Sequence, residues 1–476
     1  MRARGQGFLT LLLAGILAVG GVAFDRLGPK EPAPAPEGSV ETGAWLCPHG
    51  GGKGYEGTVF LANPGETEVS TRVTGLTAEG VSETSEVDVP PGGQVEVSVP
   101  ARDRAASTFV ETFGGWVAAG WLVRGAGGEP GLGAEPCTPQ ASRSWFSAGA
   151  TTGEGETSFL VVMNPFSTDA VLDVAMFATD RAPVRDSDLT DLTLSPRRSV
   201  AIRLNDYAQG EEALGVSIAV ASGRAAASTL VVSRDRGIES VVATPAPAAR
   251  IDLLTSTGAG QSSLSVMVPT RVADQGGDAV RAPVGQLGST FAATLRSADP
   301  PQPAGGLSDQ AQEPESAAVY PVATAGASAV DLVVRDGAPV VAALRTVGVG
   351  KDDGSTGGSA TPASSWIVTP TVAGDPSRPG VLVLNPGSGD ASVTVVSLPT
   401  GGAAEGTAAE TTITVPGGSV GAVPGRFLAA AGATSMLLRS DGSPIVALGA
   451  STSLGNEGLS LFGLAAGVPI PESQAP

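Results

Sequence analysis

A short apolar segment that ends in Asn-Pro recurs three times and constrains the fold more than any other feature of the sequence. It occupies residues 58–65, 158–165 and 380–387. Runs of Val, Leu and Phe of this length are typical of buried strands. Proline then ends the strand because it has no N–H to donate, and Asn tolerates the turn that follows. The residues that define the repeat are Asn63 and Pro64, Asn164 and Pro165, and Asn385 and Pro386.

A tryptophan precedes each of these asparagines by 18 or 19 residues, at Trp45, Trp145 and Trp366. Downstream, each unit has a hairpin around a glycine, and the same hairpin occurs once more where Trp and Asn-Pro are missing. The four glycines are Gly115, Gly223, Gly337 and Gly442. We therefore expect four units, of which the third is degenerate and has Val268 in place of the Asn. A period near 110 residues is too long for a propeller blade and suits a seven-stranded antiparallel sandwich.

The predicted fold is all-β, with about four tandem antiparallel immunoglobulin-like β-sandwich units after an N-terminal helix. The abundance of Gly and Pro favours many short strands over helical bundles. Only residues 107–111 and 205–214 are predicted to form a helical turn. Gly/Pro/Ser-rich joints are expected at residues 125–142, 244–250 and 348–365. The predicted parts are a cytoplasmic N-terminus (1–7), a transmembrane or signal helix (8–24), a Pro-rich linker (25–43), and sandwich units at 44–139, 140–249, 250–362 (degenerate) and 363–476.

The N-terminus predicts export. Arg2 and Arg4 precede an uncharged stretch from Phe8 to Phe24, and basic residues before an apolar segment favour a cytoplasmic N-terminus. The stretch is close to the minimum for spanning a bilayer and longer than a usual signal-peptide core. No small-x-small cleavage site stands out, so we expect an uncleaved membrane anchor, with a secreted protein as the alternative if the helix is cleaved. Either way, the bulk of the chain would be extracytoplasmic.

The charge and the cysteines agree with that location. A net charge of −19 with only three lysines argues against a nucleic-acid partner, because polyanions are bound by clustered cations. Cys47 and Cys137 bracket the first unit, and in an oxidising compartment we expect a structural disulfide between them. Two free buried thiols are the alternative. A bond closing this 90-residue loop would contribute about 4–5 kcal/mol in the chain-entropy model.

Several short motifs together resemble a known family. They are Trp45-Leu46-Cys47-Pro48, Pro136-Cys137, Ser144-Trp145-Phe146-Ser147-Ala148-Gly149 and Asn164-Pro165-Phe166. In combination they are similar to an actinobacterial envelope family catalogued as domain of unknown function 5719, over nearly the whole extracytoplasmic part. The resemblance implies secreted or anchored proteins with tandem sandwich repeats. It brings no known activity and no functional residues, and the third unit departs from its pattern.

The sequence contains no recognisable catalytic constellation. His49, the single histidine, lies in a glycine-rich segment and is expected to be a solvated surface residue. One histidine makes a His-based zinc site or a Ser-His-Asp triad hard to build. Residues 417–421 and 52–57 match a nucleophile elbow and a dinucleotide loop as text, but neither leads into a helix. We therefore predict no catalytic residue, no cofactor and no metal site.

Two further groups of residues, the clustered aspartates and the tryptophans, are candidates for binding. Asp186, Asp188 and Asp191 cluster in one loop and Asp352-Asp353 lie in a joint, so calcium between units is an alternative, although the spacing matches no calcium loop. The repeated tryptophans are expected to pack in the core.

Trp116 and Trp121 are five apart, which on one strand puts them on opposite faces. The more exposed of the two is the best candidate for contact with a glycan or a partner.

These observations predict a non-enzymatic cell-envelope protein that displays a surface for another envelope protein or for a cell-wall glycan. The competing hypothesis is an enzyme that acts on wall polysaccharide through paired carboxylates, since such pairs are defined by distance in space and not by sequence spacing. A cleft holding two carboxyls, one of them with a raised pKa, would favour the enzyme.

Overall fold

The computed structural model describes residues 42–125, 127–233, 236–269, 288–297, 301–347, 353–369, 380–401, 408–431, 435–454, 460–471 and 474. The chain divides into two compact units, Met1–Glu41 and Thr42–Pro476. The predicted cytoplasmic N-terminus, the membrane helix and all but the end of the linker lie outside the described residues. Within the described residues, none of the helices has the length and apolar character needed to cross a membrane.

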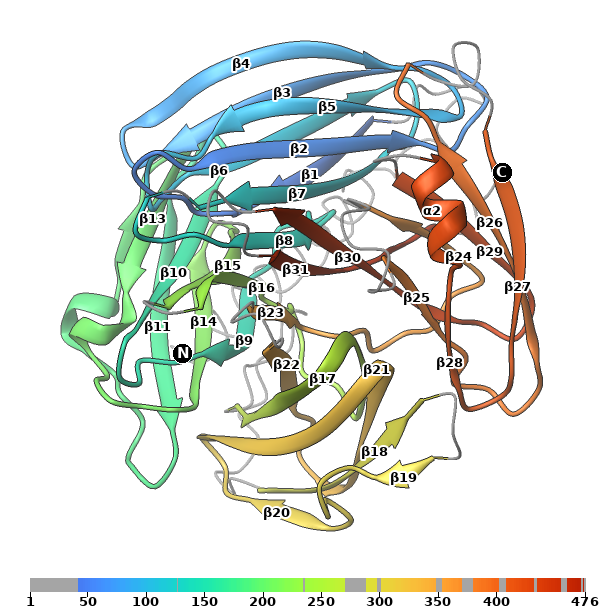
Figure 1. The fold of residues 1–476 in the computed structure, drawn as a ribbon. Helices are drawn as coiled ribbons and strands as arrows, with labels where there is room; N and C mark the ends of the chain where they lie inside the picture. The colour runs from blue at the N-terminus through green and yellow to red at the C-terminus, as the bar shows by residue number, and fades with distance from the viewer. Residues whose placement is uncertain are drawn as a thin grey trace, which may run out of the picture. The chain divides into compact units, whose positions relative to one another are not determined.

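The described chain is almost entirely antiparallel β-sheet, which confirms the all-β prediction (Figure 1). We group its strands into four modules along the chain.

Module 1 contains β1 (Thr42–Cys47), β2 (Glu56–Asn63), β3 (Val69–Thr77), β4 (Gly80–Val89), β5 (Gly93–Pro100), β6 (Ser107–Phe113), β7 (Ala118–Arg124) and β8 (Leu132–Pro136). Module 2 contains β9 (Ser144–Ala150), β10 (Glu156–Asn164), β11 (Ala170–Ala178), β12 (Leu192–Leu194), β13 (Arg198–Arg203), β14 (Leu214–Ser222), β15 (Ala226–Ser233) and β16 (Gly237–Val242), with the 3-10 turns η1 (Ser187–Leu189) and η2 (Leu204–Asp206).

Module 3 contains β17 (Arg250–Val268), β18 (Ser289–Arg296), β19 (Gln302–Pro303), β20 (Gln310–Gln312), β21 (Ser316–Gly337), β22 (Val341–Val347) and β23 (Asp353–Thr356). Module 4 contains β24 (Ser365–Val368), β25 (Val381–Leu384), β26 (Ala391–Leu398), β27 (Glu410–Val415), β28 (Val420–Ala422), β29 (Ser435–Gly442), β30 (Val446–Leu454), β31 (Ser460–Ala466) and β32 (Val468–Pro469), with helix α2 (Gly425–Ala431).

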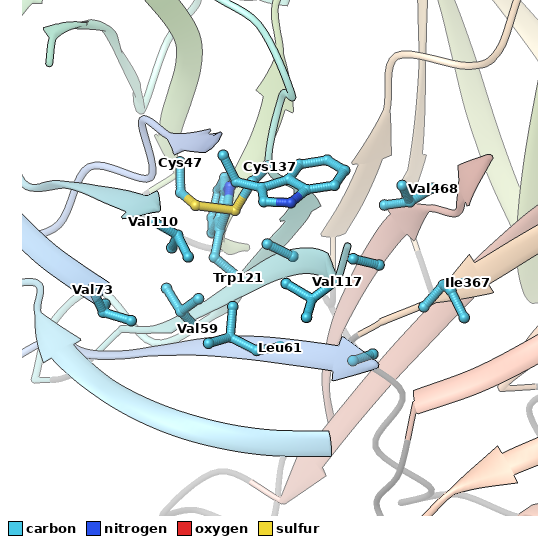
Figure 2. Close-up of a cluster of buried hydrophobic side chains, with 14 of the residues drawn as sticks. Cys47, Val59, Leu61, Val73, Val110, Val117, Trp121, Cys137, Ile367 and Val468 are labelled. Atoms are coloured by element: carbon cyan, nitrogen blue, oxygen red, sulfur yellow. A yellow bond between two sulfur atoms is a disulfide. The ribbon is translucent and has the colours of Figure 1, made fainter. Parts of the chain in front are cut away.

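Modules 1, 2 and 4 share one topology. If the strands of each module are counted from its start, the first, sixth, third and fourth form one sheet, and the fifth, second, seventh and eighth form the other. In module 1 both sheets contribute to one core, which includes Leu61, Val73, Val110 and Trp121 (Figure 2). The immunoglobulin order instead pairs the first strand with the second and the seventh with the sixth. The connectivity therefore differs from the predicted immunoglobulin-like one in the places of the first, fourth and seventh strands, since the fourth pairs here with the third and not with the fifth.

Modules 1 and 2 have eight strands, one more than the predicted seven. Module 3 has seven, two of them double-length, and module 4 has nine, because β32 pairs with β24 at the edge of its sheet. The strands β8, β16, β23 and β31, which occupy the same position in the four modules, contact one another in cyclic order, so that β31 of module 4 also lies against β8 of module 1 (Figure 1). We call these four the inner strands. Two of them, β8 and β23, lie in segments that the sequence predicted to be joints, because their Gly-rich composition is also what allows inner strands to approach closely.

Module 3 explains why the third repeat is degenerate. Its β17 and β21 form one continuous antiparallel ladder from Arg250↔Val333 to Val268↔Ser316, with a register shift between Thr257 and Ala259 of β17. Each long strand thus takes the place of two strands in the other modules. Both halves of the ladder contribute to one core, so the ribbon folds over itself.

Left-handed glycines connect the sixth and seventh strand positions of each module. They are Gly114, Gly223, Gly337 and Gly442, so the first lies one residue before the predicted Gly115. A Cβ on Gly223 would fall 2.7 Å from a backbone oxygen of Asp169, which leaves no room for another residue.

The helix predictions were largely wrong. Residues 107–111 belong to β6, where Thr108 and Val110 pair with β1 and β3, and their branched side chains suit a strand. Of residues 205–214, two end the 3-10 turn η2. Helix α2 was not predicted from the sequence.

Candidate functional site: a buried carboxylate and arginine cluster

Five charged side chains from modules 2 and 3 meet where these modules touch. We call this group the seam cluster. Module 2 supplies its members from β10, from β16 and from the residue before β16, while module 3 supplies them from the adjacent strands β22 and β23. The members are Glu156, Arg236, Glu239, Arg345 and Asp353.

Arg345 is the centre of the seam cluster. Its Nη2 lies 2.7 Å from Glu156 Oε1 and 2.9 Å from Asp353 Oδ2, so one nitrogen joins carboxylates of two modules. Its Nε lies 2.8 Å from Glu239 Oε1, at ion-pair distance but without the alignment of a hydrogen bond. Arg236 contacts the same group, since its Nη2 pairs with Glu156 and its Nε lies 3.4 Å from Asp353 Oδ2.

Burial and the charge of Arg345 act in opposite directions on the pKa of the three carboxyls. The exposed fractions of the Glu156, Glu239 and Asp353 side chains are 4%, 2% and 1%. Burial raises the pKa of Glu239 although Arg345 opposes it, and burial together with the Glu239 charge raises the pKa of Asp353 to about 7. Burial also acts to raise the pKa of Glu156, but the hydrogen bond and charge of Arg345 lower it below its ordinary value.

This arrangement joins modules 2 and 3 and contains more carboxyls than guanidinium groups. Three carboxylates face two guanidinium groups, so full ionisation would leave one negative charge in excess. Ser355 of β23 donates a hydrogen bond to Glu239 Oε2 across the seam. Since the carboxyls are buried and paired with arginine, a polysaccharide chain cannot reach them without opening the seam.

A second charged network extends from module 3 to module 4. Arg296 Nη2 lies 2.6 Å from Asp331 Oδ2, and its Nη1 donates to the backbone oxygen of Gly418 in module 4 at 3.2 Å. Arg250 Nη2 lies 3.2 Å from Asp331 and 3.4 Å from Asp252. Burial raises the pKa of Asp252 to about 6, although the Arg250 charge acts against it.

His49 is buried, and the prediction of a solvated residue was wrong. The glycine-rich segment that carries it folds against module 2, where a Cβ on Gly50 would fall 3.0 Å from Leu230. His49 Nδ1 lies 2.7 Å from Gly50 O and Nε2 lies 2.9 Å from Thr108 Oγ1. Since a carbonyl oxygen only accepts, this network assigns the proton to Nδ1. Burial lowers the pKa of His49 to about 4, which makes the ring a neutral structural group.

Glu135 is a further buried carboxyl, on inner strand β8. Burial raises its pKa well above the ordinary value, although the backbone N–H of Val242 on β16 donates to it. Gly131, the residue before β8, shows how closely the chain approaches β16, since a Cβ there would lie 2.2 Å from Ile238 N. Glycine is therefore required where the inner strands meet.

The asparagines of the repeat have a shared structural role. In Asn63, Asn164 and Asn385 the side-chain amide donates to two backbone carbonyls, and the side-chain oxygen accepts the N–H two residues later. For Asn164 the acceptors are Thr168 O at 2.8 Å and Leu194 O at 3.0 Å. All three side chains are buried. Each asparagine thus holds the turn after its strand against the end of the fourth strand.

The repeated tryptophans Trp45, Trp145 and Trp366 are buried at the first strand of their modules. The indole N–H of Trp145 donates to Ala225 O at 2.7 Å, and that of Trp366 donates to Ile445 O at 2.8 Å. Both acceptors directly precede the seventh strand, so the same contact fixes the two sheets in modules 2 and 4.

The two other tryptophans do not lie on one strand as predicted. Trp121 is in β7 and is fully buried, whereas Trp116 precedes β7 and is partly exposed. Trp116 packs edge-on against Trp45 with ring centroids 5.9 Å apart. Trp116 is thus the more exposed of the pair.

Two of the acidic residues considered for calcium, Asp186 and Asp353, have other partners in the structure. Asp186 caps η1 by accepting from Asp188 N at 2.9 Å. Asp353 is in strand β23 and in the seam cluster, and Asp352 lies outside the described residues. Within the described part of the chain, no group of three or more His, Cys, Asp or Glu side chains is placed to hold a metal ion.

Sequence analysis missed four members of the seam cluster: Glu156, Arg236, Glu239 and Arg345. Glu239 and Arg345 could have been recognised from the sequence, because each is the single charged residue of its strand. Charged residues at such positions are rarely buried unless they are paired. The partner of each lies in another module, and sequence spacing contains no information about that pairing.

Comparison with known proteins gives one informative match. The family described as "Family of unknown function (DUF5719)" matches residues 111–357, just over half of the chain. No curated protein matches. Among solved structures, an α-L-rhamnosidase of Streptomyces avermitilis complexed with L-rhamnose has 11% identity and a TM-score of 0.14. That match covers 82% of this chain and 56% of the enzyme's chain, and a similarity this low supports no conclusion.

Proposed function

The chain belongs to the DUF5719 family, whose function is unknown, and from this premise we propose that it is a non-enzymatic scaffold of an actinobacterial cell envelope. It would be extracytoplasmic, anchored by its N-terminal helix or secreted if that helix is cleaved. Four sandwich-type units would present a surface to another envelope protein or to a cell-wall glycan.

The observation that carries this proposal is the seam cluster. A glycosidase needs two carboxyls at the substrate, one of them with a raised pKa. The Glu239 and Asp353 pair has the raised pKa, but both side chains are buried and contact Arg345. The carboxyls with a raised pKa, which would favour an enzyme if they were accessible, contact a residue of the neighbouring module or strand instead. This supports a scaffold over an enzyme.

Two features support the location. The Cys47–Cys137 bond joins the end of β1 to the residue after β8 (Figure 2), and such disulfides persist in oxidising compartments. The arrangement of Arg2 and Arg4 ahead of an apolar stretch favours export.

The first test is co-purification of the tagged full chain from its native membrane after mild crosslinking, followed by mass spectrometry. Recovery of specific envelope proteins supports a protein partner, and recovery of wall glycan alone supports a glycan ligand. Turnover of wall polysaccharide by the purified chain, abolished by Asp353→Asn, would overturn the scaffold proposal in favour of the enzyme.

Trp116 is the candidate contact residue on the scaffold. We expect Trp116→Ala to weaken retention of the protein on isolated cell wall if a glycan is the ligand, because sugars stack on exposed indoles. Phe166→Ala is the matched control, since Phe166 is 40% exposed in module 2 and far along the chain from Trp116. Equal retention of both variants and the unmodified chain argues for a protein partner.

A further inference from the structure

We propose that the seam between modules 2 and 3 is a pH-dependent joint, in which one proton held between Glu239 and Asp353 balances the charge of the seam cluster. Loss of this proton would loosen the contact between inner strands β16 and β23. The joint would respond to pH whatever partner the scaffold displays.

Charge counting is the first support. Arg236 and Arg345 bring two positive charges to the cluster, and Glu156, Glu239 and Asp353 bring three negative charges when all are ionised. An uncompensated charge is strongly disfavoured where side chains are withdrawn from water. One bound proton makes the cluster neutral.

The contacts indicate which carboxyls share the proton. Glu156 Oε1 is contacted by nitrogens of both guanidinium groups, which favours its ionised form. Asp353 Oδ2 also contacts both guanidinium groups, but Asp353 Oδ1 and Glu239 Oε1 have no hydrogen-bond partner among the described residues, which Glu156 Oε1 has. Burial raises the pKa of Glu239 and of Asp353, and the charge of Glu239 adds to the effect on Asp353.

The strands around the joint supply few other charges. β9, β15 and β31 contain no ionisable residue, and β8 contains only Glu135. On β17, Asp252 is paired with Arg250 in the separate network toward module 4. Among the described residues, the proton balance of the joint is therefore set by the five members of the seam cluster together with Glu135, whose pKa burial also raises.

The direction of the pH effect follows from the raised pKa. Asp353 has a pKa of about 7 in the closed joint and an ordinary value near 4 when exposed. Between these values the closed joint binds one proton more than the open one. Opening then becomes about tenfold more favourable per pH unit and levels off above pH 7. The joint is tight at pH 5 and loosened at pH 8.

Hydrogen exchange on the full chain tests this directly. We would measure protection factors, corrected for intrinsic exchange, for amides of β16 and β23 between pH 5 and 8. Amides of β3 and β4 serve as an internal reference, because these strands belong to the sheet of module 1 that does not contain its inner strand. The variants are Asp353→Asn and Glu239→Gln, which mimic the protonated acids, and Asp88→Asn, a matched exposed control on β4.

We expect protection of β16 and β23 to fall about tenfold per pH unit up to pH 7 in the unmodified chain and in Asp88→Asn. In Asp353→Asn it should stay high and flat. If that variant does not fold, Glu239→Gln carries the same expectation. A flat profile in the unmodified chain would overturn the proposal, as would a fall that persists in both amide variants. Loss of folding in both, while Asp88→Asn folds, would also overturn it, because neutral amides should preserve the charge balance.

Discussion

Three asparagines occupy the same place in three modules. Each side chain forms hydrogen bonds with backbone groups that would otherwise have no partner in the turn. Removal of the Asn164 amide would leave the buried carbonyls of Thr168 and Leu194 without their donor. We expect Asn164→Ala to lower the free energy of unfolding by about 2–4 kcal/mol, since each unsatisfied buried group costs about 1–3 kcal/mol. Thermal and urea unfolding of the full chain would measure this.

A matched variant separates the donor from the acceptor role. Asn164→Asp keeps the oxygen that accepts the N–H of Phe166 but loses both donated hydrogen bonds and buries a charge. It should be at least as destabilising as the alanine variant near neutral pH. A change below about 0.5 kcal/mol in either variant, the range typical of surface substitutions, would show that the asparagine is not the clamp described.

His49 offers a second prediction at the scale of one residue. Because it is the single histidine of the chain, its NMR signal is unambiguous. We expect it to titrate near pH 4 in the folded protein and near pH 6.5 in urea.

Since only the unfolded state binds the proton between these values, His49 lowers stability as pH falls from 6.5 to 4, by roughly 3 kcal/mol in total. Titration near 6.5 in the folded protein would mean that the ring is solvated.

At the scale of the element, the apolar buried strands could be predicted from the sequence, whereas the inner strands could not. Residues 58–63 and 158–164 have continuous apolar runs, and the structure makes them β2 and β10. Inner strand β23 reads Asp353-Gly354-Ser355-Thr356, a composition typical of a loop. It is a strand because neighbouring modules cover it, and that cover comes from residues more than 100 positions away.

The same dependence on residues distant in the sequence explains why the seam cluster was not predicted. The disulfide was predictable because two cysteines allow one pairing. The ion pair between Glu156 and Arg345 was not, since many carboxylates and arginines offer similar alternatives in sequence.

The disulfide ties inner strand β8 to strand β1, which belongs to the other sheet of module 1. We expect the double variant Cys47→Ser, Cys137→Ser to lose about 4–5 kcal/mol of stability in urea, as the chain-entropy model gives for a loop of 90 residues. Both cysteines are buried, so in native buffer a thiol reductant should act only as fast as the protein opens. Rapid reduction without loss of structure would contradict this placement.

At the scale of the whole unit Thr42–Pro476, the modules are joined by shared cores and not only by the chain. The core of module 1 includes Leu230 of module 2. It also includes Ile367 and Val468 of module 4 (Figure 2). Cyclic contact between inner strands resembles the arrangement of blades in a propeller. The repeat length argued against blades because modules 1, 2 and 4 each add a second sheet to the one that carries the inner strand, and module 3 has one seven-stranded sheet.

Closure of module 4 onto module 1 gives the last prediction. Gln94 is buried, accepts from Ser435 N at 2.6 Å and donates to Thr400 Oγ1 at 3.4 Å, both in module 4. Because modules share core residues in a closed order, calorimetry should show one cooperative transition, with equal calorimetric and van't Hoff enthalpies. Gln94→Ala leaves the Ser435 N–H without this acceptor and should split off an earlier transition, whereas the exposed control Gln209→Ala should not. Several resolved transitions in the unmodified chain would instead describe four modules that unfold independently, joined like beads by their linkers.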